Sequence, residues 1–112
     1  MMIEFKPDIK DSIVVYNAFE DNRNTGRVLL TVEKTKAVLV NIQAVDDETA
    51  EGLIRSALNA AANRDGYSCV YQPEEFRNVA AMLGFRNENG ILVGEIPFLL
   101  TGSCCGCSKN CQ

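Results

Sequence analysis

The chain has 112 residues, a net charge of −4 and a hydrophobic fraction of 46 %, which predicts one domain with one core. The acidic balance argues against a nucleic-acid partner, because such a protein needs a basic face to displace counterions, and the absence of histidine excludes a Ser-His-Asp triad. No apolar run is long enough to span a membrane and the N-terminus does not read as a signal peptide, so we expect a cytoplasmic protein with no membrane partner.

The first half of the chain predicts an antiparallel meander of three strands. Residues 12–19, 27–32 and 37–45 are rich in β-branched and aromatic side chains, and polar turn residues separate them. The segment before residue 12 has room for one short strand at residues 3–5. Alternation in the third strand places one set of side chains in the core: Val38, Val40, Ile42 and Ala44. Asn41 and Gln43 then lie on the opposite face, as expected where a strand runs out into a site or solvent.

The middle of the chain predicts two helices joined through a short strand. Apolar residues recur at helical spacing over residues 46–63, and Asp46 or Asp47 can act as the N-cap. Residues 67–71 read as a strand. A second helix over residues 73–83 has Pro73 at its first position and stops at Gly84.

The last part of the domain predicts a hairpin. Asn89-Gly90 is a strong turn signal between a short strand at residues 85–88 and a longer one at residues 91–100. Pro97 within the longer strand indicates a bulge or an edge position there.

Residues 12–100 taken together resemble the core of the GNAT-type N-acetyltransferases, also called acyl-CoA N-acyltransferases. The matching features are the order of the elements and the Leu83-Gly84-Phe85 signature. The resemblance implies an α/β (α+β) fold with a mostly antiparallel mixed sheet and two principal helices, without the family's usual N-terminal helical part. The acyl-CoA N-acyltransferase domain is then residues 1–101, and the short N-terminal part makes a homodimer an expectation.

In that family, backbone N–H groups at the start of the main helix bind the pyrophosphate of acetyl-CoA, as helix N-termini bind anions generally. The resemblance places this cofactor site at Val45, Asp47, Glu48, Thr49, Ala50, Glu51 and Gly52. The family's loop usually reads Gln or Arg, two residues, Gly, one residue, then Gly or Ala. Here Asp47 replaces the basic or amide residue and Ala50 the central glycine, while Gly52 remains. The acidic residues around this loop oppose a phosphate.

The resemblance also implies the chemistry. Backbone N–H groups near Ala44 and Val45 would activate the thioester carbonyl of a CoA thioester, and a small amine would attack it directly. Glu33 or Glu20 would serve as base, whereas Ala80 stands where the family commonly has a tyrosine acid. This interpretation gives an acyl-CoA-dependent N-acetyltransferase-like protein with a degenerate pyrophosphate loop.

A second hypothesis concerns the C-terminal tail, residues 102–112, which carries Cys104, Cys105, Cys107 and Cys111. Such density in a cytosolic chain is more typical of metal or redox chemistry than of structural disulfides. Four thiolates favour zinc or another thiophilic metal. The alternative function is therefore a non-enzymatic binding protein with a metal-binding or redox-sensing cysteine cluster. A disordered, reduced tail is equally consistent with the pattern.

Overall fold

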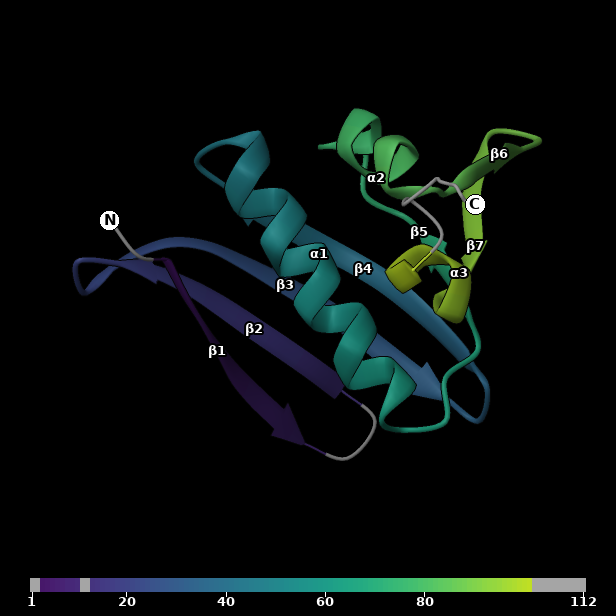
Figure 1. Ribbon diagram of the computed structural model, residues 1–112, viewed down its shortest axis with the longest axis horizontal. Helices are drawn as coiled ribbons and strands as arrows, with labels where there is room; N and C mark the ends of the chain where they lie inside the picture. The colour runs from purple at the N-terminus through teal and green to yellow at the C-terminus, as the bar shows by residue number, and fades with distance from the viewer. Residues whose placement is uncertain (1–2, 11–12, 102–112) are drawn as a thin grey trace.

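A seven-stranded mixed sheet organises the computed structural model, which describes residues 3–10 and 13–101 (Figure 1). The strand order is β1-β2-β3-β4-β5-β7-β6; β4 and β5 are parallel, and the other neighbours are antiparallel. The strands are β1 (Ile3–Lys10), β2 (Ile13–Glu20), β3 (Arg23–Glu33), β4 (Lys36–Ala44), β5 (Ser68–Tyr71), β6 (Arg86–Glu88) and β7 (Ile91–Glu95). This confirms the expected α+β class with a mostly antiparallel sheet.

The meander of β2, β3 and β4 matches the expected order, but β1 is longer than the predicted strand at residues 3–5. It pairs with β2 along its whole length, from Ile3 opposite Glu20 to Lys10 opposite Ile13. Pro7 lies within β1, which is compatible with its place at the sheet edge, where a missing N–H breaks no ladder bond on the open side.

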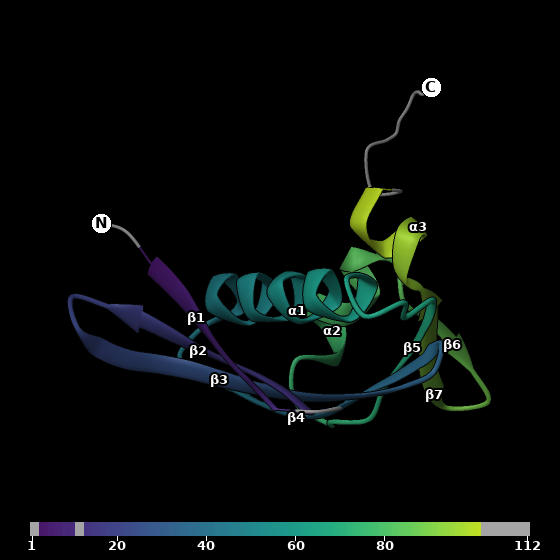
Figure 2. The ribbon, with the colours of Figure 1, turned by 90° about the horizontal axis from the view of Figure 1, so that it is seen from below.

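The helices α1 (Asp47–Ala62), α2 (Arg77–Leu83) and α3 (Ile96–Thr101) all lie on one side of the sheet (Figure 2). The α1 stripe expected from the sequence is the centre of the core, and Leu53, Ile54 and Leu58 are at most 1 % exposed. Fully burying a side chain of this size stabilises the fold by about 1.5–3 kcal/mol. The apolar periodicity of α1 therefore decides which face of the sheet is covered. Within the described part of the chain, no helix is both long enough and apolar enough to cross a membrane.

Two predicted elements near the C-terminus are wrong in extent. The second helix begins at Arg77 instead of Pro73, because Phe76 has a left-handed backbone (φ 60°) that interrupts any earlier start. The strand predicted at residues 91–100 ends at Glu95, and the chain turns into α3. Ile96 and Leu99, three residues apart, are both buried, and Pro97 sits in the first turn of α3, where its missing N–H is tolerated.

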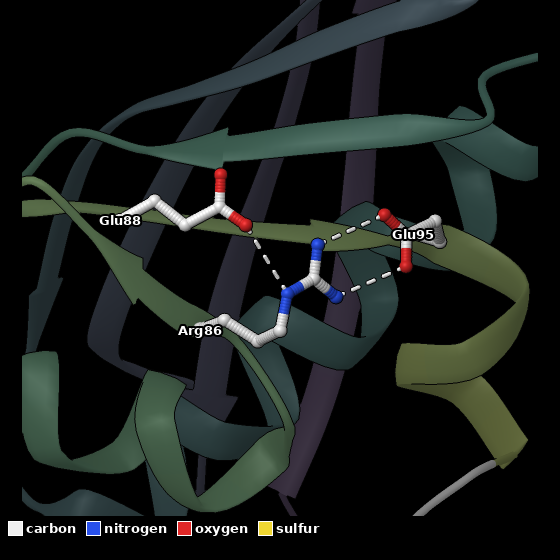
Figure 3. Close-up of polar contacts among 3 residues, drawn as sticks. All are labelled: Arg86, Glu88 and Glu95. Carbon is white, nitrogen blue, oxygen red and sulfur yellow. Dashed lines mark hydrogen bonds and ion pairs between the residues drawn. The ribbon is translucent and has the colours of Figure 1, made fainter.

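The hairpin predicted at Asn89-Gly90 is confirmed. Both residues have positive φ, 57° and 88°, as the two central residues of a type I′ turn require. On β6, Arg86 donates to both carboxylate oxygens of Glu95 (3.0 and 3.1 Å) and to Glu88 (3.4 Å), as Figure 3 shows. The hydrogen bonds with Glu95 raise the pKa of Arg86, and the same bonds lower the pKa of Glu95. The charge of Arg86 is thus satisfied within the hairpin.

Candidate active site

The parallel strands β4 and β5 separate at a defined point. They pair from Lys36 opposite Ser68 to Leu39 opposite Tyr71, and the N–H of Gln72 then donates to the carbonyl of Leu39 (3.0 Å). Beyond this fork β5 has ended, whereas β4 continues to Ala44. Among the described residues, the edge of β4 past the fork therefore has no strand partner on the β5 side.

A β-bulge lies at the fork. Leu30 of β3 is opposite Leu39, and its neighbour Leu29 is opposite Asn41, so Val40 is an extra residue in β4. The bulge reverses the alternation of side chains at this point. The predicted common face of Val38, Val40, Ile42 and Ala44 is therefore wrong: Ile42 is buried, but the buried residues before the bulge are Ala37 and Leu39. Val40 is 40 % exposed.

Backbone geometry decides which β4 amides face the free edge. The N–H of Val45 donates to the carbonyl of Thr25 on the β3 side (3.0 Å). In an antiparallel ladder the direction of N–H groups alternates residue by residue, so those of Ala44 and Ile42 point away from β3. Of the two backbone groups predicted to activate a thioester, Ala44 has its N–H on the free edge and Val45 does not.

The start of α1 is capped as expected. The Asp46 carboxylate accepts a hydrogen bond from the N–H of Thr49 (2.8 Å), and this bond lowers the pKa of Asp46. Thr49 and Ala50, both predicted cofactor residues, are buried with 1 % and 0 % exposure. One of the N–H groups that a phosphate would use at this terminus is thus occupied by the chain's own carboxylate.

A cavity of about 350 Å³ lies between the first half of α1 and α2. Its lining combines carboxylates, one cation and apolar side chains: Asp47, Glu48, Glu51, Arg55, Val79, Met82 and Leu83. Arg55 forms an ion pair with Glu51 (3.1 Å), so the cation is engaged by one of these carboxylates. The structure thus brings three of the predicted cofactor residues together, in a cavity with an acidic lining.

Gly52, the remaining glycine of the predicted loop, serves packing within the chain. A Cβ atom at this position would lie 2.2 Å from Cζ of Phe5. The aromatic ring of β1 therefore occupies the space that the glycine leaves.

The two predicted bases lie at different ends of the sheet. Glu33 is opposite Lys36 at the β3–β4 turn, eight residues along β4 from Ala44 and hence about 26 Å away. Glu20 lines a separate cavity of about 440 Å³ together with Asp21, Arg23, Thr25 and Val45. Glu20 is thus the one that the structure brings near the end of β4.

Tyr71, the last residue of β5 at the fork, belongs to the protein core. Tyr71 is 1 % exposed, its hydroxyl donates to the backbone carbonyl of Glu75, and its ring packs edge-on against Phe85 at 5.8 Å. Burial and the nearby Glu75 raise the pKa of Tyr71 well above its usual value. Ala80 is fully buried in α2, and Tyr67 is 57 % exposed. Tyr71 is therefore a structural residue of the core.

Sequence reasoning left open whether Asn41 and Gln43, on the face of the sheet away from the helices, border a site or solvent. A cavity of about 220 Å³ lies there, lined by Arg27, Leu29, Asn41 and Gln43. The signal that could have found it was the polar side chains of Asn41 and Gln43 in an otherwise apolar strand.

The cysteine hypothesis cannot be placed on this structure, since Cys104, Cys105, Cys107 and Cys111 lie outside the described residues. Residues 3–10 and 13–101 contain no group of three or more side chains that could hold a metal ion. Cys69 is buried in β5, and desolvation raises the pKa of its thiol to about 12. Cys69 is therefore a neutral core residue.

Comparison with known proteins identifies the fold. No protein-family model and no curated protein matches the sequence. Among solved structures, a GNAT-family protein from Desulfovibrio desulfuricans has a TM-score of 0.67 at 14 % identity, over 76 % of this chain and 70 % of that chain. The aminoglycoside 6'-N-acetyltransferase from Enterococcus faecium has a TM-score of 0.66 at 11 % identity, over 79 % and 77 %.

A third similar structure contains the cofactor. The PaiA N-acetyltransferase from Thermoplasma acidophilum, solved in complex with coenzyme A, has a TM-score of 0.60 at 14 % identity, over 75 % of this chain and 61 % of that chain. At these identities the likeness establishes the fold. With its forked β4–β5 pair and its helix after β4, the chain therefore has the fold of the GNAT-type N-acetyltransferases.

Proposed function

We propose that the chain binds an acyl-CoA thioester at the fork between β4 and β5 and transfers the acyl group to an amine. The free edge of β4 beyond Leu39 carries this proposal, because it offers strand amides that no strand of the described residues pairs with, in a fold shared with N-acetyltransferases. The structure with bound coenzyme A supports the same class of ligand for this fold.

The free edge suits the pantetheine arm of CoA. This arm contains amide groups, which can hydrogen-bond to an exposed strand edge in the way that an added peptide strand does. The N–H groups of Ile42 and Ala44 point to this edge. The N–H of Ala44 would then stabilise charge on the thioester oxygen during attack, a role for which the N–H of Val45 is less suited because it is bonded to Thr25.

The reaction requires little from acidic or basic side chains. The amine nitrogen attacks the thioester carbon, a C–N bond forms, the C–S bond breaks, and CoA leaves as a thiolate. The amine loses a proton and the thiolate gains one. Since Tyr71 is buried and Ala80 replaces the family's usual tyrosine, both protons exchange with solvent in this proposal.

The CoA phosphates would lie close to carboxylates that repel them. Asp47, Glu48 and Glu51 line the cavity between α1 and α2, so we expect weak binding that is strongly dependent on phosphate charge. That a second copy of the chain completes the acceptor side stays a prediction, which sedimentation equilibrium would check.

A thermal-shift measurement with acetyl-CoA, and with CoA for comparison, tests the proposal. Binding to the folded state raises the melting temperature. Ala44→Pro removes an N–H from the free edge and should lower the shift, whereas the matched variant Ala44→Ser keeps that N–H and should retain it. The proposal fails if acetyl-CoA at millimolar concentration leaves the melting temperature of the wild-type protein unchanged.

A further inference from the structure

The cavity on the helix-free face is built from two neighbouring cross-strand pairs. Arg27 of β3 is opposite Gln43 of β4, and Leu29 is opposite Asn41. Directly opposed side chains have Cβ atoms about 4.5–5.5 Å apart, and residues two apart along a strand share a face. The four side chains therefore surround one shallow space of about 220 Å³.

This cavity adjoins the place where acyl transfer would occur. Gln43 directly precedes Ala44, whose N–H would stabilise charge on the thioester oxygen, and Asn41 follows the bulge residue Val40. The helices lie on the other side of the sheet (Figure 2), as do Asp47 and Glu48 at the start of α1. An amine that approaches the N–H of Ala44 from the helix-free face therefore passes Gln43, with Arg27 opposite it on β3.

The lining of this cavity is positively charged. Arg27 is its one charged residue, and within residues 3–10 and 13–101 no carboxylate forms an ion pair with it. Arg86, by contrast, is held by Glu95 and Glu88 (Figure 3). The cavity between α1 and α2 and the cavity at Glu20 are both lined by carboxylates. In a chain with a net charge of −4, this cavity combines an arginine with two amides and no lining carboxylate.

We infer that the acceptor is an amine that also carries a carboxylate, of the amino-acid class. This inference rests on the proposed function. The Arg27 guanidinium is suited to a two-point hydrogen bond with a carboxylate, and the side-chain N–H of Gln43 adds a further donor. Leu29 offers an apolar surface to the carbon skeleton. The amino group of an amino acid, one carbon away from the carboxylate, then lies beside Gln43 and close to the N–H of Ala44, and the product is an N-acyl amino acid plus CoA thiol.

The same lining disfavours polycationic amines. Polyamines and aminoglycosides bind where carboxylates balance their charge, and this cavity has none among its lining residues. Selectivity is thus expected from attraction of a carboxylate to Arg27 and from repulsion of additional positive charge.

The test compares each proteinogenic amino acid with its carboxamide as acceptor, with acetyl-CoA as donor and thiol release as readout. Spermidine and kanamycin are included as polycations. We expect kcat/KM to be roughly tenfold to a hundredfold higher for the best free acid than for its amide, the range for a hydrogen bond to a charged group. Arg27→Gln should remove this preference, while Arg23→Gln, on the same strand but at another cavity, should keep it.

Two additional measurements separate this inference from the proposed function. The acetyl-CoA thermal shift should be the same in Arg27→Gln as in the wild type, because Arg27 faces away from the helices. Amino acids should also shift the Nε–H NMR signal of Arg27 in the absence of acetyl-CoA, and their amides should not. If acetyl-CoA binds but amides or polycations are acetylated as well as free acids, or if no amino acid shifts the Arg27 signal, the inference is overturned and cofactor binding stands. If acetyl-CoA does not raise the melting temperature of the wild-type protein, the proposed function itself is overturned.

Discussion

The ring of Phe5 in β1 packs directly on the backbone of Gly52 in α1. A Cβ atom built on Gly52 would lie 2.2 Å from Cζ of Phe5 and within 3 Å of two more ring atoms. The edge strand and the main helix are therefore joined through a position where any side chain would collide. Phe5 therefore leaves no room for a side chain at the glycine of the predicted pyrophosphate loop.

Gly52→Ala should destabilise the protein, although alanine favours an isolated helix over glycine by about 1 kcal/mol. The added methyl must displace the Phe5 ring, and overpacking of this kind typically costs about 1–3 kcal/mol. The measurement is urea unfolding of the single variants and of Phe5→Leu with Gly52→Ala. Since the cause is one contact, the smaller side chain at position 5 should restore much of the loss. A stabilised Gly52→Ala protein with Phe5 intact would contradict this contact.

Removing carboxylates at the α1–α2 cavity should strengthen CoA binding. Asp47→Asn and Glu48→Gln each remove a charge that opposes a phosphate by about 1 kcal/mol at contact in water, so the dissociation constant should fall roughly fivefold per substitution. Isothermal titration calorimetry at low salt measures this. Glu74→Gln, an exposed residue that does not line the cavity, is the matched control and should leave the affinity unchanged. If Asp47→Asn, Glu48→Gln and Glu74→Gln all bind CoA with the same affinity, the CoA phosphates bind away from this cavity.

The Asp46 cap should make the start of α1 sensitive to acid. The hydrogen bond from the N–H of Thr49 lowers the pKa of Asp46, so the folded state holds the carboxylate ionised to lower pH than the unfolded chain does. Its contribution is present above the ordinary aspartate pKa and is lost as the pH falls through the lowered value. Asp46→Ser keeps a capping oxygen that does not titrate. The difference in melting temperature between the two proteins should therefore change below pH 4 and stay constant above pH 6.

Cys69 should behave as an inert thiol in the folded state. Burial raises its pKa from 9.0 to about 12, so in the unfolded state it ionises first as the pH rises. Its contribution to stability is complete below pH 9 and decreases between pH 9 and about 12. In a protein with the four tail cysteines replaced by serine, Ellman's reagent at pH 8 should release no thiol chromophore until urea unfolds the chain. Rapid labelling of the folded protein would contradict this burial.

The tail hypothesis remains a separate prediction. If Cys104, Cys105, Cys107 and Cys111 bind a thiophilic metal, the reduced full-length protein should retain zinc through dialysis, and a protein that ends at Gly102 should not. Plasma emission spectrometry of both preparations decides this. Equal metal content in the two would remove the tail as a metal site.

Elements specified by neighbouring residues could be predicted from the sequence. The helix α1, with its Asp46 cap and its apolar stripe, and the Asn89-Gly90 hairpin both follow from local periodicity and turn chemistry. The order of strands and helices then pointed to the fold that the solved structures share. These features need no knowledge of distant contacts.

Tertiary structure decided the features that depend on two distant segments. The bulge at Val40 is a mismatch between β4 and β3, so alternation within β4 alone put the wrong side chains in the core. The early end of β7 depends on burial of Ile96 and Leu99 in the core, and the use of Gly52 depends on Phe5, 47 positions earlier. The cavity at Arg27 likewise exists only because β3 and β4 pair in one register. The sequence by itself determined the elements and their order, because these are local properties, whereas the pairing register between strands determined where the candidate site lies.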